Sequence, residues 1–143
     1  MSFCAPTTYK WVNPVDIHQY WPVIKEGVES ICKSHDHWIP EDLYTSIKTG
    51  SINCHVGYIG NRYVGFITTQ QQQAETGNKL HVWAAYSSGR DFDILSESVG
   101  KLKEWAANIN ANRITFSTTR KGWEKQAPKL GFNKSLITYE MQL

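Results

Sequence analysis

The chain has 143 residues, of which 41% are hydrophobic and 20% are charged, values that are ordinary for a soluble domain with one hydrophobic core. The 15 basic and 13 acidic residues nearly balance, with a net charge of +2, so the charge gives no reason to expect a nucleic acid or a membrane surface as partner. No window approaches the roughly 20 consecutive apolar residues of a membrane span.

The N-terminal "MSFCAPTTYKW" has neither a charged lead nor a long apolar run, so it does not resemble a secretory signal. Cys4, Cys32 and Cys54 are odd in number and form no CxxC pair. Free thiols in a reducing compartment are the simplest interpretation, and a zinc site is not expected. The expected location is the cytoplasm, or the host cytoplasm if the protein is viral.

The first elements are a short strand and a long helix. Residues 7–12, "TTYKWV", are typical of a strand. Asn13 is the predicted N-cap of the helix that follows, with Pro14 at its first position and Asp16 in its first turn. Apolar residues then recur at spacings of three and four up to Ile31, which predicts an amphipathic helix. Pro22 interrupts that helix and is expected to kink it.

A loop at 33–40 leads to a second helix at 40–50 and then to two strands, 53–59 and 62–69. Pro40 and Glu41 suit the first turn of that helix, and Gly50 suits its end. Gly60 and Asn61 between the strands predict a two-residue hairpin turn. Residues 70–79, "QQQQAETGNK", are polar and are predicted as a turn.

The second half of the chain alternates strands and helices. We expect strands at 80–86, 113–119 and 135–143, a helix at about 93–108, and a short helix at 123–130 that stops at Gly131. The strand, helix and strand over 80–119 predict a crossover with parallel pairing. The fold class is therefore α/β, with a single domain built on a mixed sheet and helices on both faces.

Three segments carry a family resemblance. "RYVGFITT" at 62–69, "KLKEWAANINANRITFSTT" at 101–119 and "WEKQAPKLGFNKSLITYEM" at 123–141, with its "KLGF", resemble the third strand, the central helix with the fifth strand, and the closing elements of the GNAT superfamily of acyl-CoA-dependent N-acetyltransferases. "HWIPEDLYTSIKTG" at 37–50 resembles small phage-encoded members. The resemblance implies a single GNAT-like domain over 1–143, acetyl-CoA as co-substrate and an amine acceptor, either a small molecule or a protein.

The resemblance also implies where acetyl-CoA binds. In the family the pantetheine arm bonds to the backbone of the strand that is matched by "LHVWAAY", here at Val82 and Ala84. The pyrophosphate binds to backbone N–H groups of the next loop, which needs glycines because the phosphates come close to the backbone. Those glycine positions fall on Arg90 and Phe92, and Gly89 lies one residue early.

Two interpretations of this loop stay open. In the first, the segment is a rearranged phosphate site in which two hydroxyls, a flexible amide and a guanidinium replace the glycines; its residues are Ser87, Ser88, Gly89 and Arg90. In the second, Phe92 fills the site while Asp91 and Asp93 cap the helix and repel phosphate.

The predicted catalytic residues are His81 and Glu75. His81 is the titratable side chain within the strand 80–86, and an imidazole suits a general base near neutral pH. Glu75 lies just before that strand. The family's tyrosine acid corresponds to Ala127 here, and its nearest substitutes are Gln126, Trp123 and Tyr139. Catalysis by proximity alone is the remaining alternative.

The loop between the first two helices borders the acceptor site in the family. The predicted acceptor contacts are therefore His37, Trp38 and Glu41, together with Trp83 and Trp123. The run His35–Asp36–His37 resembles a metal pair, but adjacent loop residues rarely point at one ion, so no metal is expected.

Two classes of function follow from these features. The first is an N-acetyltransferase. The second is a catalytically inactive GNAT-fold protein, of viral origin in one version, that binds a protein partner or assembles with itself, for example as a homodimer. The missing glycines and tyrosine, together with six tryptophans, favour the second class, because tryptophan is enriched in interfaces.

Overall fold

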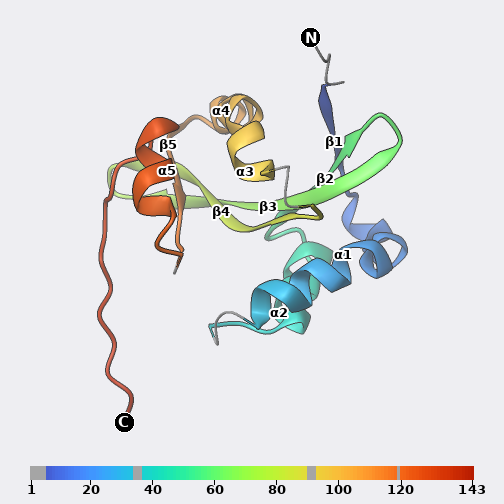
Figure 1. Ribbon diagram of the computed structural model, residues 1–143, viewed down its shortest axis with the longest axis horizontal. Coiled ribbons are helices and arrows are strands. Elements are labelled where there is room, and N and C mark those ends of the chain that lie inside the picture. Colours follow the sequence, from blue (N-terminus) through green and yellow to red (C-terminus); the bar gives the residue numbers. More distant parts are fainter. Residues whose placement is uncertain (1–5, 34–36, 90–92, 119) are drawn as a thin grey trace.

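The computed structural model describes residues 6–33, 37–89, 93–118 and 120–143. Five strands form one sheet in the order β1-β2-β3-β4-β5 (Figure 1). Neighbours are antiparallel from β1 to β4, whereas β4 and β5 are parallel. The strands are β1 (Thr7–Trp11), β2 (Asn53–Ile59), β3 (Arg62–Ala74), β4 (Gly77–Ser87) and β5 (Ala111–Phe116). The predicted α/β class with a mixed sheet is confirmed.

Helices cover both faces of the sheet (Figure 1). One face carries α1 (Ile17–Cys32) and α2 (Pro40–Lys48); the other carries α3 (Ile94–Glu97), α4 (Val99–Asn108) and α5 (Trp123–Lys129). A 3-10 turn, η1 (Pro14–Asp16), precedes α1. Asn13 caps η1 as predicted, because its side-chain oxygen accepts the N–H of Val15 at 3.3 Å.

Each face has its own core. The α1 and α2 side buries Ile24 and Val28 of α1 against Phe66 of β3. The other side buries Leu102 of α4 against Leu80 and Val82 of β4. Two buried layers on one sheet are the expected way to remove the apolar faces of these helices from water.

The predicted polar turn at 70–79 is wrong in its extent. β3 runs on to Ala74, β4 begins at Gly77, and only two residues, Glu75 and Thr76, make the turn. Gln70 is held in the strand by pairing with His81, and its side chain bonds to Gln72 at 3.0 Å. The pairing with β4 and this side-chain bond along β3 outweigh the weak strand preference of glutamine.

Two other boundaries differ from the prediction. The helix expected at 93–108 is divided at Ser98 into α3 and α4. The Ser98 hydroxyl donates to the Leu95 carbonyl at 3.1 Å, and such bonds to the preceding turn bend helices. The strand predicted at 113–119 is observed as β5 at Ala111–Phe116.

The strand predicted at 135–143 does not form. Residues 132–143 contain neither helix nor strand, and the chain there runs away from the sheet (Figure 1). The alternating apolar and polar pattern makes a strand only when an edge is available to pair with it, and in this conformation the segment meets none.

Candidate active site

The strands β4 and β5 part at their carboxyl ends. Their pairing stops at Val82 and Phe116, although β4 continues to Ser87. Residues 84–87 of β4 therefore pair with β3 alone, and within the described residues the other edge of residues 83–87 has no strand partner. We name residues 83–87 the open half of β4. Free backbone N–H and C=O groups along such an edge can bind an extended ligand that carries amides.

A bulge begins the open half. Thr69 pairs with Val82 but Thr68 pairs with Ala84, so Trp83 is the additional residue on β4. The buried hydroxyl of Thr68 donates to the Ala84 carbonyl at 3.2 Å and holds this geometry from the β3 side. Bulges bend a strand and change where its side chains point. No sequence pattern signalled this one.

The two serines of the predicted phosphate site are engaged within the protein. The Ser87 hydroxyl accepts the N–H of Ile94, the first residue of α3, at 2.9 Å. The N–H of Ser88 donates to the Val64 carbonyl at 2.9 Å, and its hydroxyl lies 3.4 Å from the Tyr63 carbonyl. Gly89 is exposed. Arg90, Asp91 and Phe92 lie outside the described residues.

The beginning of α3 is capped from within the chain. Asp93 accepts the N–H of Leu95 at 3.2 Å, and its second oxygen accepts the Ser96 hydroxyl at 2.6 Å. Together with the bond from Ile94 to Ser87, this occupies the N–H groups of the first two residues of α3. Of the predicted phosphate-binding groups, the Gly89 amide makes no hydrogen bond to another described residue.

His81 lies where the paired part of β4 meets the open half. It pairs with Thr115 across the parallel ladder, and its Nδ1 is 2.8 Å from the Thr115 hydroxyl oxygen. When Nδ1–H donates to that oxygen, Nε2 carries the lone pair that accepts a proton. Burial, assisted by the charge of Lys79, lowers the pKa of His81, so its imidazole is neutral at pH 7. Sequence reasoning missed Thr115, because its proximity depends on the register between two distant segments.

Glu75 and His81 are not brought together. Glu75 lies in the turn between β3 and β4, at the amino end of β4, whereas the open half is at its carboxyl end. His81 is six residues after Glu75 along the extended chain, which at about 3.3 Å per residue separates their Cα atoms by roughly 20 Å.

The predicted acceptor contacts divide between the two faces. The rings of Trp38 and Trp83 are in contact, with centroids 5.3 Å apart, and the Trp83 indole donates to Gln70 at 3.2 Å. Both tryptophans pack on the core that α1 and α2 cover. His37 and Glu41 belong to the loop before α2 and to its first turn. Sequence reasoning missed the bond between Gln70 and Trp83, because Gln70 lies within the predicted turn at 70–79.

Trp123 belongs to the opposite face. It begins α5 and packs edge-to-face on Phe116, the last residue of β5, at 5.1 Å. Trp123 therefore lies at the carboxyl end of β5, on the face of the sheet opposite Trp83.

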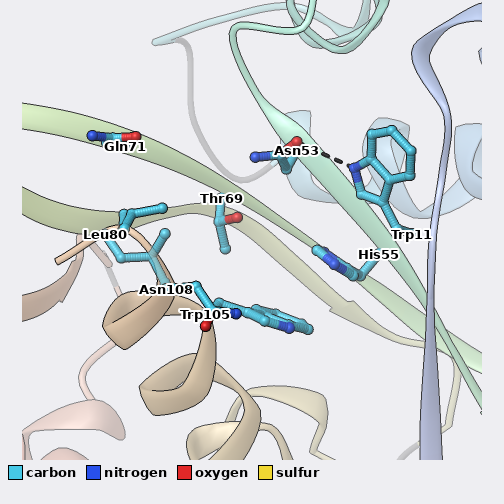
Figure 2. Close-up of a pocket in the computed structure, with 9 residues that line it drawn as sticks. Trp11, Asn53, His55, Thr69, Gln71, Leu80, Trp105 and Asn108 are labelled. Carbon is cyan, nitrogen blue, oxygen red and sulfur yellow. Dashed lines mark hydrogen bonds between the residues drawn. The ribbon is translucent and has the colours of Figure 1, made fainter. Parts of the chain in front are cut away.

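A cavity of about 320 Å³ lies under α4. Figure 2 shows its wall, in which Trp11 donates to Asn53 and the His55 ring lies beside Trp105. The last two rings stack with centroids 3.9 Å apart. Burial lowers the pKa of His55 to about 4, and its buried Nδ1 has no hydrogen-bond partner among the residues that the structure describes. The cavity meets β4 at Leu80, away from the open half.

The described residues offer neither a metal site nor a membrane-spanning helix. There, no group of three His, Cys, Asp or Glu side chains could hold a metal ion. His35 and Asp36 lie outside the residues that the structure describes. No described helix combines the length and the hydrophobicity that a membrane crossing requires.

No protein-family model matches the chain, and no curated protein matches it either. Solved structures do match. A ribosomal-protein-alanine N-acetyltransferase from Brucella melitensis biovar Abortus 2308 is similar with a TM-score of 0.70 at 12% identity, over 96% of this chain and 99% of that one. An aminoglycoside acetyltransferase from a soil metagenomic sample, in complex with sisomicin, gives 0.71 at 10% identity over 96% of both chains.

A third structure is a predicted acetyltransferase from Clostridium acetobutylicum, solved with acetyl-CoA, with a TM-score of 0.67 at 15% identity over 95% of this chain and 96% of that one. These comparisons confirm the resemblance drawn from the sequence at the level of the fold: the chain has the GNAT acyltransferase fold. At such identities the likeness shows the fold alone.

Proposed function

We propose that this protein is an N-acetyltransferase that transfers an acetyl group from acetyl-CoA to an amine. The observation that carries the proposal is the open half of β4, where a strand edge is left unpaired beside Phe116. The fold and the acetyl-CoA in the Clostridium structure support the same co-substrate.

The pantetheine arm of acetyl-CoA contains two amides in an extended chain. The edge that follows Val82 offers it backbone donors and acceptors, including those of Ala84, in the manner of an added strand. The residues therefore fit this part of the molecule. For the pyrophosphate we propose Gly89 and Arg90, because Ser87 and Ser88 already bond within the protein.

Acetyl-CoA supplies the acetyl group as a thioester. The amine nitrogen forms a bond to the carbonyl carbon, the carbon–sulfur bond breaks, and the sulfur leaves as a thiolate that takes up a proton from solvent. Nε2 of His81 accepts the proton that the amine loses, and Thr115 orients the ring through Nδ1. Trp38 and Trp83 form an aromatic wall for the acceptor.

For the acceptor we propose a chemical class, an amine. Among the similar proteins, one is named for ribosomal-protein alanine and another binds the aminoglycoside sisomicin. Both kinds of molecule are amines, and a first panel contains an alanine-terminated peptide, an aminoglycoside and a simple diamine.

Thermal unfolding with and without acetyl-CoA tests the proposal. Ligand at about 100 times its dissociation constant adds roughly 2.7 kcal/mol, which raises the Tm of a domain of this size by several degrees. Gly89→Trp should abolish the shift. The matched control is Gly122→Trp, because Gly122 is exposed with nothing near its added Cβ.

The second candidate is a catalytically inactive protein that keeps the GNAT fold but does not transfer acetyl groups, and that binds a protein partner or assembles with itself. The observation in its favour is the capping of α3 by Ser87 and Asp93, which occupies amides that a phosphate would use. No thermal shift in the unmodified protein, and no thiol release with any amine of the panel, would reject the enzyme and favour this candidate.

A further inference from the structure

The cavity under α4 takes no part in the proposed acetyl transfer, because it meets β4 at Leu80 and not in the open half. The register of the sheet assembles its strand side. Trp11 of β1 pairs with His55 of β2, and Asn53 of β2 pairs with Thr69 of β3. Since paired residues and alternate residues of a strand share a face of the sheet, these four side chains gather on the face that α4 covers.

Aromatic rings form one part of the wall (Figure 2). The imidazole of His55 stacks on the indole of Trp105, with ring centroids 3.9 Å apart and planes 16° from parallel. The indole of Trp11 is 49% exposed, and its N–H donates to Oδ1 of Asn53 at 3.2 Å. Flat walls of this kind favour a flat ligand, because rings stack with their faces offset or meet edge to face.

Carboxamides form the polar part of the wall. They belong to Asn53, Gln71 and Asn108. Oδ1 of Asn53 is already used by Trp11, so this residue offers a ligand only donors. The side chains of Gln71 and Asn108 make no hydrogen bond to another described residue. Each of the two therefore presents an acceptor and a donor side by side.

The wall that the described residues form carries no charge at pH 7. It contains no Asp, Glu, Lys or Arg, and the pKa of about 4 keeps the imidazole of His55 neutral. A charged group of a ligand would lose its hydration there without gaining a partner of opposite charge. The volume of about 320 Å³ lies at the low end of small-molecule pockets, which suits a single ring system.

We propose that this cavity binds an adenine base. The ring lies against the aromatic wall, and the carboxamide of Gln71 or Asn108 pairs with the adjacent N6–H₂ donor and N7 acceptor, as Asn and Gln do with adenine. Guanine presents two acceptors, O6 and N7, and needs a double donor such as Arg, which the described wall lacks. Cytosine also has an adjacent donor and acceptor, but its single ring covers less of the aromatic wall.

The adenine can come from a free nucleoside or from a nucleotide or cofactor. Adenosine, AMP and CoA carry the same base and differ in their phosphates. Because the described wall offers a phosphate no cation, adenosine should bind at least as tightly as the other two. Binding of adenosine alone supports a free nucleoside, and equal binding of AMP or CoA supports a base that belongs to a larger molecule.

The experiment titrates the ¹⁵N-labelled full chain with adenosine and follows the indole N–H signals of its six tryptophans. Trp11→Phe and Trp105→Phe assign the two signals of the cavity. We expect both signals to shift saturably, with a dissociation constant between about 10 μM and 1 mM. Guanosine and methyl glucoside should bind at least about fivefold more weakly. No saturable shift overturns the proposal, and so does guanosine or the glucoside binding as tightly as adenosine.

A double variant tests the carboxamides. Gln71→Met with Asn108→Leu removes both amides with little change in volume, and both residues are exposed, so the variant should fold. Its dissociation constant for adenosine should rise at least about tenfold; an unchanged constant overturns the proposal. Gln73→Met is the matched control, because Gln73 is an exposed glutamine of the same strand that does not line the cavity.

This inference does not depend on the proposed acetyl transfer. Gly89→Trp should remove the Tm shift with acetyl-CoA and leave the adenosine titration unchanged, because Gly89 does not line the cavity. Loss of adenosine binding in that variant would place the base beside the open half and overturn the proposal.

Discussion

The two halves of β4 differ in what surrounds them. The half from Asn78 to Val82 has β3 on one side and β5 on the other, and buries Leu80 and Val82 in the core under α4. The open half, residues 83–87, has β3 on one side and no strand on the other among the described residues. One continuous strand therefore provides both a fixed framework and an edge that can bind a ligand.

This difference explains how the fold forms a candidate binding edge within one strand, without a separate loop. Because β5 ends at Phe116, the parallel pairing ends at Val82, and the bulge at Trp83 bends β4 at the same place. The open half depends on β3 and on α1 beneath it, so changes there should have larger effects than changes at exposed turns.

The largest effect is expected at Gly65 of β3, which faces Ser87 in the open half. Its φ is +150°, and an added Cβ would lie against the backbone carbonyl of Tyr86. Gly65→Val should reduce the free energy of unfolding by about 3 kcal/mol or more, measured by urea denaturation. Gly60→Asn is the control, because Asn tolerates the positive φ of that open turn. Equal stability of the two variants would show that β3 does not hold the open half.

The second effect concerns acetyl transfer and is expected at His81, near the junction between the two halves of β4. His81→Gln should lower kcat/KM for acetyl transfer by about 100-fold, the lower range for a lost general base. In the unmodified protein the lowered pKa of His81 keeps the base neutral to a lower pH than in a free histidine. The acid limb of the rate profile should therefore lie below pH 6.5.

Glu75→Gln is the comparison for that experiment. Because Glu75 lies at the other end of β4, we expect kcat/KM to stay within about twofold of the unmodified value. If Glu75→Gln proves to be the damaging change and His81→Gln harmless, the reaction does not occur beside the open half.

The third effect tests the support of the open half by α1. An added Cβ at Gly27 would lie 2.5 Å from the Tyr86 ring and 2.8 Å from Phe66. Gly27→Ala should lower the free energy of unfolding by about 1–3 kcal/mol, although alanine favours the helix. Gly100→Ala in α4 has open space around it and should raise stability by about 0.5–1 kcal/mol. The difference in Tm between these two variants measures the cost of packing the added methyl group at Gly27. If both changes stabilise the protein, α1 does not pack on β3 and β4 as closely as proposed.

A pH-dependent effect should appear near the paired half, at His55. The pKa of His55 is lowered from 6.5 to about 4 by burial, so between these values the unfolded chain binds a proton that the folded chain does not. Stability should then fall as the pH drops from 6.5 towards 4, and level off below. His55→Gln should flatten this part of a Tm-against-pH curve; an unchanged slope would mean that another group causes it.

Local sequence determined most of the elements. The cap at Asn13, the turn at Gly60 and Asn61, and the apolar spacing of α1 depend on neighbours in the chain, and the structure has all three. The segments that resemble GNAT proteins predicted the fold for the same reason, because the order of such elements allows few arrangements. The positions of His81 and Trp83 on β4 were also readable, since a buried strand leaves a clear apolar run.

The tertiary structure alone decided how β4 and β5 part, that Thr115 meets His81, and that Ser87 and Asp93 occupy the amides of α3. It also left residues 135–143 outside the sheet, although their alternation is that of a strand. Each of these depends on a register or an edge supplied by a distant segment. The periodicity of a sequence indicates which face of a strand a side chain lies on. Which residue of another strand it contacts is decided only by the register of the assembled sheet.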